Sequence, residues 1–217
     1  NSTEGAVGRT LDLLLGSPLK ICGEVVLRIH QHLMSRETSL GAITKVYSHA
    51  QSLAQCHEWL NRSLPGVPRI SVGSNAEAAR LASVEPGAAA IAGEAASERY
   101  ELPRLVENIE DEPNNTTRFF VLGRHDAGPS GADKTSLIMS ATNRPGAVHL
   151  LLAPLAAAGV SMSRLESRPA RAALWEYVFY VDIEGHRDEP AVKTALAALA
   201  AEAAYLKILG SYPQAVY

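Results

Sequence analysis

Residues 135–160 read TSLIMSATNRPGAVHLLLAPLAAAGV, and this stretch contains the pattern that decides the fold of the C-terminal part of the chain. The run 135–141 has the length and apolar content of a strand, and the Pro-Gly pair that follows it opens a helix over 145–158. Further strands are expected at 160–168, 174–184 and 205–210, with an alanine-rich helix at 189–203. The order βαββαβ within about 80 residues predicts a ferredoxin-like split βαβ fold.

Short strands and helices also alternate in the N-terminal part of the chain. We expect strands at 20–34, 69–72, 88–91, 104–106 and 118–122, and helices at 1–15, 48–60, 74–83 and 94–100. Ser48 with Gln51, and Ser74 with Glu77, have the spacing of a capping box, in which two side chains satisfy the amides at a helix start. Alternation at this spacing predicts an α/β fold with parallel strands. The polar, Gly- and Pro-rich run 126–133, DAGPSGAD, predicts a linker.

The composition of the chain limits its partners. Twenty basic and 23 acidic residues among 217 give a net charge of −3, so no basic surface for nucleic acid or an anionic membrane is expected. No apolar run approaches the ~20 residues that span a bilayer. We expect a cytoplasmic protein with neither a nucleic acid nor a membrane as partner. Cys22 and Cys56 are expected to be free thiols, with a single disulfide as the alternative.

The sequence motifs that could bind a metal ion or a cofactor each lack a necessary residue. His30 and His32 alternate on one face of an expected strand and would form half of a metal site, but no Cys, His or Asp cluster completes it. His57-Glu58 lacks the second histidine of a zinc-protease helix, and Gly73-Ser74-Asn75 lacks the lysine of a phosphate loop. We therefore expect no metal and no cofactor.

Three motifs, at the start, middle and end of the chain, carry a resemblance to a known family. Residues 1–7 read NSTEGAV, residues 115–122 read NTTRFFVL, and residues 166–169 read ESRP. They resemble, in this order, the Asn-Ser-x-Glu-Gly-x-Val segment and the Thr-Arg-Phe signature of prephenate dehydratases, and the Glu-Ser-Arg-Pro motif of their ACT domain. The resemblance extends from Asn1 to about Pro213. The family's catalytic domain begins well before the residue that matches Asn1, so part of its first lobe is expected to be absent.

The resemblance implies two α/β lobes arranged like a periplasmic binding protein, followed by an ACT domain. The implied boundaries are 1–18 and 103–123 for the incomplete first lobe, 19–102 for the second lobe, 124–134 for the linker and 135–217 for the ACT domain. The chain would thus cross between the lobes twice.

Prephenate loses its ring hydroxyl and ring carboxylate together, and formation of the aromatic ring drives the reaction. A proton donor near the hydroxyl and donors around the carboxylates are therefore sufficient. The resemblance implies Thr117 as the proton donor. Arg118 would either contact a carboxylate or brace the lobes through a salt bridge, because successive strand residues face opposite sides.

Further polar residues match the family's cleft. These are Asn1, Ser48 and Gln55, and Ser48 is also an expected helix cap. The two roles are compatible, because the start of a helix binds anions. By the same argument, Ser74 and Asn75 are expected to form a second site for a carboxylate.

The resemblance places an effector, L-phenylalanine, at an interface between two ACT domains. Helix-start amides at Gly146, Ala147 and Val148 would hold its carboxylate, and Glu166 would hold its ammonium group. The remaining contacts are implied for Ser167, Arg168 and Pro169. His149 stands where the family has valine, which changes the fine shape of this pocket.

The sequence is thus interpreted as a prephenate dehydratase of phenylalanine biosynthesis, inhibited by phenylalanine and assembled as a homodimer or homotetramer. Two alternatives stay open. One is the same chemistry on arogenate, and the other is a non-catalytic amino-acid-binding regulator that keeps the fold.

Overall fold

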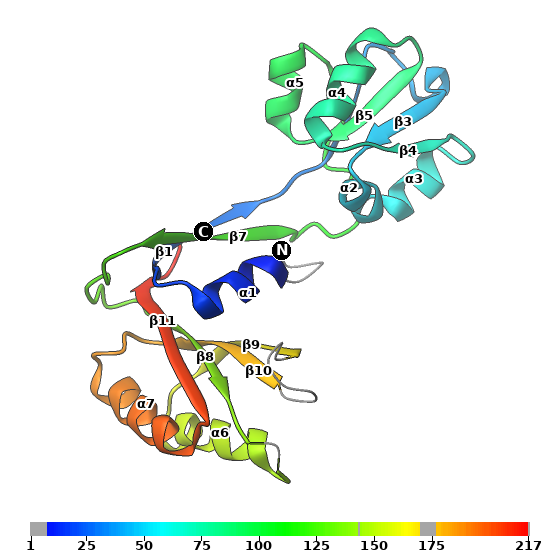
Figure 1. The fold of residues 1–217 in the computed structure, drawn as a ribbon. Helices are drawn as coiled ribbons and strands as arrows, with labels where there is room; N and C mark the ends of the chain where they lie inside the picture. Colours follow the sequence, from blue (N-terminus) through cyan, green and yellow to red (C-terminus); the bar gives the residue numbers. More distant parts are fainter. Residues whose placement is uncertain (1–7, 143, 170–176, 217) are drawn as a thin grey trace. The chain divides into compact units, whose positions relative to one another are not determined.

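The computed structural model describes residues 8–142, 144–169 and 177–216, which form an α/β protein of two compact units (Figure 1). Leu27–Thr117 belong to the first unit, and the described parts of Ala6–Val26 and Arg118–Tyr217 belong to the second. The chain passes between the units inside β1 (Lys20–Arg28) and β7 (Thr116–Gly123), which pair as a two-stranded sheet.

The first unit is built on a five-stranded sheet with the order β4-β3-β5-β2-β6. The strands are β2 (His32–Ser35), β3 (Lys45–Ser48), β4 (Arg69–Ser71), β5 (Ala88–Ala92) and β6 (Arg104–Val106). The helices are α2 (Ala50–Gln55), α3 (His57–Ser63), α4 (Asn75–Val84) and α5 (Glu94–Tyr100), with a 3-10 turn at Leu40–Ala42. Strand β3 runs parallel to β4 and β5, whereas β2 runs antiparallel to β5 and β6.

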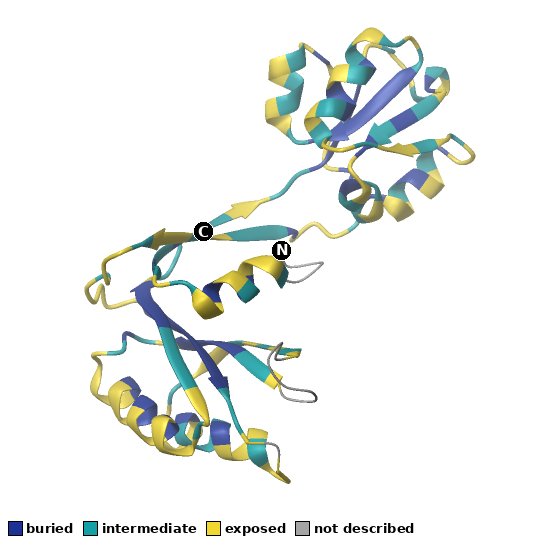
Figure 2. Ribbon diagram, viewed as in Figure 1, coloured by how far each residue is buried: buried dark blue, intermediate teal, exposed yellow. Residues whose placement is uncertain are grey.

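Strand β5 is buried along its whole length, as Figure 2 shows, because helices cover both of its faces. Ala89 and Ile91 pack with Leu60 of α3, whereas Ala90 packs with Ala79 of α4. A strand covered on both faces has no polar side to show, which explains its uninterrupted apolar sequence.

The second unit contains a four-stranded antiparallel sheet with the order β11-β8-β10-β9. Its elements are β8 (Asp133–Ser140), α6 (Ala147–Ala157), β9 (Met162–Pro169), β10 (Tyr177–Glu184), α7 (Pro190–Glu202) and β11 (Tyr205–Pro213). If β8, β9, β10 and β11 are numbered 1 to 4 in chain order, their order in the sheet is 4-1-3-2. This is the arrangement of the predicted ferredoxin-like fold.

Each face of this sheet has its own core. Leu137 and Val181 face α6 and α7, while Ile138 and Tyr180 face α1 (Gly8–Gly16) and β1. The C-terminal carbonyls of α1 are satisfied by Lys207, whose ammonium group donates to the carbonyl oxygens of Leu14, Leu15 and Ser17 at 2.8–2.9 Å.

Several expected elements are confirmed and others are wrong. All six elements expected in the C-terminal part are present, as are β4, β5, β6, α4 and α5. The expected strand 20–34 is two strands, interrupted where the Ile29 amide donates to Asn115 O and the Gln31 amide donates to Glu110. Strand β3 was not expected. The start of the expected helix 1–15 lies outside the described residues, and α1 ends at Gly16 as expected.

The capping predictions had opposite outcomes. Ser74 caps α4, since its hydroxyl accepts from the Glu77 amide at 3.1 Å, as predicted. Ser48 does not cap a helix, because it is the last residue of β3; His49 caps α2 instead, and the helix breaks at Cys56.

Both cysteines are free thiols, as expected, and burial raises the pKa of the Cys56 thiol. Among the described residues, none of the helices has the length and apolar content to cross a membrane.

Candidate functional site

A hydrogen-bonded chain of buried and half-buried polar side chains runs through the first unit from β3 to α4. The Ser48 hydroxyl donates to the Ile91 carbonyl oxygen at 2.7 Å and lies 3.0 Å from Asn75 Oδ1. Asn75 Oδ1 also accepts from the His49 amide at 3.0 Å, and its Nδ2 donates to Ser52 Oγ at 2.9 Å. Ser48 and Asn75, which the sequence indicated separately, therefore belong to one hydrogen-bonded group.

Gln31 extends this group to Gln55. Its Nε2 atom donates to Ser52 Oγ and to Gln55 Oε1, both at 3.2 Å. Gln31 is almost completely buried, and its Oε1 atom has no hydrogen-bond partner among the described residues. Sequence reasoning missed Gln31 and Ser52. Ser52 could have been found, because it precedes Gln55 by three residues on the same helix face.

Two consecutive acidic residues, Glu110 and Asp111, hold the backbones of Gln31 and Gln55 in place. Glu110 accepts from the Gln31 amide at 2.9 Å and contacts His30 Nδ1 at 2.8 Å. Burial alone would raise the pKa of Glu110, but these hydrogen bonds outweigh it and the pKa lies below its usual range. The Asp111 amide donates to Gln55 O at 2.8 Å, while its carboxylate accepts from the first amides of α3, those of Glu58 and Trp59, both at 2.9 Å.

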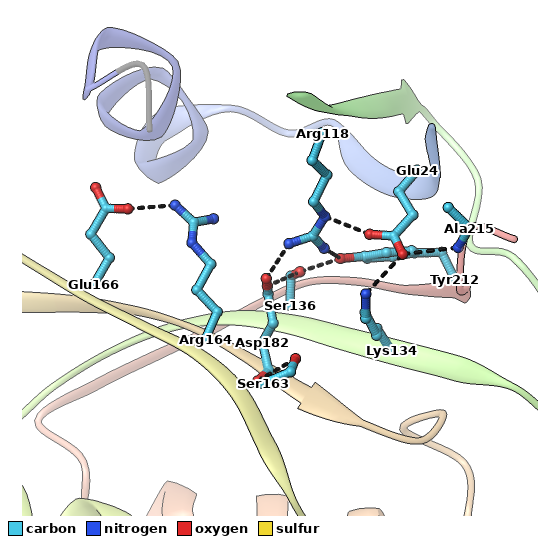
Figure 3. Close-up of polar contacts among 10 residues, drawn as sticks. All are labelled: Glu24, Arg118, Lys134, Ser136, Ser163, Arg164, Glu166, Asp182, Tyr212 and Ala215. Atoms are coloured by element: carbon cyan, nitrogen blue, oxygen red, sulfur yellow. Dashed lines mark hydrogen bonds and ion pairs between the residues drawn. The ribbon is translucent and has the colours of Figure 1, made fainter. Parts of the chain in front are cut away.

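Thr117 and Arg118 lie on β7, where alternation turns their side chains to opposite faces. The Arg118 guanidinium is enclosed by protein groups, shown in Figure 3. Its Nε donates to Glu24 at 2.5 Å, its Nη1 to Asp182 and its Nη2 to the Tyr212 hydroxyl at 2.6 Å. Of the two roles left open for Arg118, this geometry favours bracing, with the four-stranded sheet as the partner rather than a second lobe. A direct role with substrate stays a prediction.

The residues indicated for the effector divide between the two faces of the four-stranded sheet. Gly146, in the left-handed region at φ 76°, precedes α6, and Ala147 begins it. In β9, Glu166 lies opposite Tyr180, and Ser167 lies opposite Phe179. Because Phe179 packs on the core under α6 and α7, Ser167 and Pro169 share the helix-covered face, while Glu166 and Arg168 share the other.

The two charged members of this set already have partners. Glu166 forms an ion pair with Arg164, and Arg168 Nε lies 3.2 Å from Asp12 Oδ1. Strand alternation thus places neighbouring side chains of 166–169 on opposite faces of the sheet, and their contacts with an effector stay a prediction. Asn1 lies outside the described residues. Within the described ranges, no group of three or more His, Cys, Asp and Glu side chains is arranged to hold a metal ion.

The fold and this pattern of polar residues define a class, an α/β unit joined to an ACT-type domain. A family model described as prephenate dehydratase matches residues 1–127, and one described as ACT domain matches residues 135–201. The chain belongs to the prephenate dehydratase family.

Among curated relatives, the bifunctional chorismate mutase/prephenate dehydratase of Neisseria gonorrhoeae is 58% identical over 219 residues and covers 100% of the chain. The prephenate dehydratase of Amycolatopsis methanolica is 38% identical, over 99% of this chain and 72% of its own length. The chain spans 60% of the length of the bifunctional relative.

Two solved structures share the fold over nearly the whole chain. Prephenate dehydratase from Arthrobacter aurescens in complex with L-Phe is 33% identical, with a TM-score of 0.86 over 98% of this chain and 72% of that one. GqqA, described as a novel type of quorum quenching acylase, is 30% identical, with a TM-score of 0.84 over 99% of this chain and 79% of that one.

Proposed function

We propose that the protein dehydrates and decarboxylates prephenate to phenylpyruvate, and that phenylalanine regulates it through the ACT domain. The observation that carries this proposal is the likeness over the whole chain to relatives named for this reaction, together with Thr117 on β7. The hydrogen-bonded group Ser48–Asn75–Ser52–Gln31–Gln55 supports it, because it supplies fixed polar side chains in the unit that contains Thr117.

Thr117 would donate a hydrogen bond to the departing hydroxyl oxygen and pass it a proton as the carbon–oxygen bond breaks, so that water and CO2 leave; a proton from solvent then restores the Thr117 hydroxyl. A threonine hydroxyl is a weak acid, so the bond strengthens as negative charge grows on the oxygen, and this favours the transition state over the bound substrate. The start of α4, capped by Ser74, would hold one of the substrate carboxylates. Arg118 adds little charge to such a site, since Glu24 and Asp182 already pair with it.

The test is the rate of phenylpyruvate formation by the full-length protein and its variants. Thr117→Ala should lower kcat by a factor on the order of 10² or more with little change in KM, because only transition-state stabilisation is lost. Thr117→Ser keeps the hydroxyl and should retain far more activity. Thr116→Ala is the matched control, since Thr116 is the preceding strand residue and faces the opposite side. Near-wild-type activity of Thr117→Ala would show that the hydroxyl is structural.

The same assay separates the alternatives. Faster turnover of arogenate than of prephenate would identify the chain as an arogenate dehydratase. Turnover of neither, with phenylalanine binding intact, would indicate a non-catalytic regulator.

We further propose that the protein is a homodimer or homotetramer and that it is located in the cytoplasm. The two free thiols support this location, because disulfides are rare in the cytosol.

For the effector, we propose that phenylalanine binds beside the edge strand β9. Glu166 would take its ammonium group and the start of α6, at Gly146–Ala147–Val148, its carboxylate. A ligand that uses both faces of the sheet must lie past its edge, and β9 is an edge strand. This supports a site shared with a second ACT domain.

A further inference from the structure

Arg118 closes a ring of hydrogen bonds with three residues of the four-stranded sheet (Figure 3). Its Nη2 donates to the Tyr212 hydroxyl at 2.6 Å, and that hydroxyl lies 2.5 Å from Ser136 Oγ. The Ser136 hydroxyl donates to Asp182 Oδ1, and Asp182 Oδ2 accepts from Arg118 Nη1. Every hydroxyl proton has one acceptor in this ring, so its geometry is fully determined.

Glu24 completes the charge balance of this cluster. Its carboxylate accepts from Arg118 Nε at 2.5 Å, from Lys134 Nζ at 2.9 Å and from the Ala215 amide at 2.9 Å. Two cations thus face two anions whose side chains are only 1% and 4% exposed. In such surroundings a small change in the partners of Asp182 alters the position of Arg118, because an unpaired buried charge is costly.

Asp182 also lies beside the residues indicated for the effector. Its register partner on β9 is Arg164, and directly opposed side chains of an antiparallel pair have Cβ atoms about 5 Å apart. Arg164 forms an ion pair with Glu166, two residues further along the same face. Arg164 therefore stands between two carboxylates, and it is paired with Glu166 while Asp182 is paired with Arg118.

We infer that Arg164 is a relay that exchanges Glu166 for Asp182 when an amino acid binds, and that Arg118 is the positioning residue through which this exchange reaches Thr117. A ligand ammonium group on Glu166 displaces the Arg164 guanidinium, which then pairs with Asp182 and weakens the bond from Asp182 to Arg118. Arg118 directly follows Thr117 on β7, so a shift of one displaces the other. The relay rests on the proposed function.

Arg164 and its alternative partner Asp182 should respond differently to substitution. Arg164→Gln leaves Asp182 paired with Arg118, so turnover without effector stays at the wild-type level, while phenylalanine binds and no longer inhibits. Asp182→Asn weakens the hold on Arg118, so kcat falls even without effector and phenylalanine adds little further inhibition. By reciprocity, prephenate should change the phenylalanine Kd of either variant by less than about twofold.

Tyr180→Phe is the matched control, since Tyr180 lies on β10 opposite Glu166 and its hydroxyl donates to Leu11 O at 2.8 Å, outside the ring. It should lose some stability and keep full inhibition. Calorimetric titration of phenylalanine and activity at saturating phenylalanine are measured on the full-length protein and all three variants. An Arg164→Gln protein that phenylalanine inhibits as strongly as wild type would overturn the relay.

A second readout does not depend on turnover. Phenylalanine should change the hydrogen-exchange rates of the amides of residues 118–122 in wild type, and this change should be absent in Arg164→Gln. If wild type shows no such change, the relay is wrong even when prephenate is converted. If wild type shows the change but converts no prephenate, the relay stands and the proposed function falls.

Discussion

Glu24 illustrates how a single buried carboxylate acquires its properties from residues distant in the chain. Burial is the largest influence and would raise its pKa, but the Ala215 amide, the Lys134 ammonium and the Arg118 guanidinium together outweigh it and hold the pKa below the usual range. A carboxyl group whose folded-state pKa is lowered stabilises the fold above its unfolded pKa, about 4.3. That stabilisation is lost as pH falls through the lower, folded-state value.

Glu24→Gln should therefore destabilise the protein in a pH-dependent way. At pH 7 the loss of charge-assisted hydrogen bonds should cost about 1.5–3 kcal/mol of unfolding free energy. The difference from wild type should shrink as pH falls below about 4.3, because wild type then loses the same charge. Urea denaturation at several pH values measures both effects.

Glu77→Gln is the control, because its pair with Arg80 is exposed to solvent and should contribute little to stability at any pH. A Glu24→Gln penalty that does not change with pH would mean that packing, and not charge, explains it.

At the residue scale, the sequence indicated three of the five residues of the polar network in the first unit and missed the two that join Asn75 to Gln55. Ser48, Gln55 and Asn75 followed from motifs, whereas Gln31 and Ser52 carry no motif of their own. Arg118 meets Asp182 and Tyr212 across separations of 64 and 94 residues. No local pattern reports such a pairing, because it depends on how distant strands pack.

At the scale of elements, the second unit was predicted closely because its periodicities agree with its fold. Its strands carry the apolar runs that fill a core on each face of the sheet, and α6 and α7 begin directly after Gly146 and at Pro190. The first unit was predicted less well, because distant residues interrupt its local patterns. The carboxylates of Glu110 and Asp111 accept hydrogen bonds from the backbone amides of Gln31, Glu58 and Trp59. These bonds fix where β2 and α3 begin.

Gly210 is an element-scale feature with a measurable consequence. It lies in β11 at an irregularity of register with β8, and a Cβ atom added there would lie 2.0 Å from Ile21 O. A glycine inside a strand often marks such a close backbone approach. Because backbone and not a flexible side chain is in the way, β1 or β11 would have to move.

Gly210→Ala should therefore destabilise the protein by about 3 kcal/mol or more, the upper range for overpacking. Gly128→Ala is the matched control, since Gly128 has no atom within 4 Å of the position its Cβ would take. Chemical denaturation compares the two variants with wild type. Equal stability of both variants would contradict the close approach of β11 to Ile21.

At the scale of the whole chain, the predicted boundaries at 18/19, 102/103 and 123/124 remain predictions. The compact units divide the chain elsewhere, inside β1 and β7, at 26/27 and 117/118. Because β1 and β7 each continue through a division, the amino-acid composition does not change there. The sequence therefore contains no signal for where one unit ends and the other begins. The division falls between Thr117, the proposed proton donor, and Arg118, the residue through which the proposed relay reaches it.

Phenylalanine should stabilise the whole chain against unfolding. A ligand that binds only the folded protein stabilises it by about 2.7 kcal/mol at a hundred times its Kd, so the melting temperature should rise with phenylalanine concentration. Glu166→Gln removes the charge proposed for the ammonium group and should weaken this response. Glu184→Gln, on the neighbouring strand β10, is the control. Tyrosine and alanine test whether the pocket selects the ring.

The dependence of this shift on protein concentration tests where the effector sits. A site completed by a second ACT domain links binding to association, so dilution should weaken phenylalanine binding and phenylalanine should increase the sedimentation coefficient at low protein concentration. A site within one chain predicts neither change. Binding that is independent of dilution, with the melting response still lost in Glu166→Gln, would therefore keep Glu166 as the ammonium partner and remove the shared interface from the proposal.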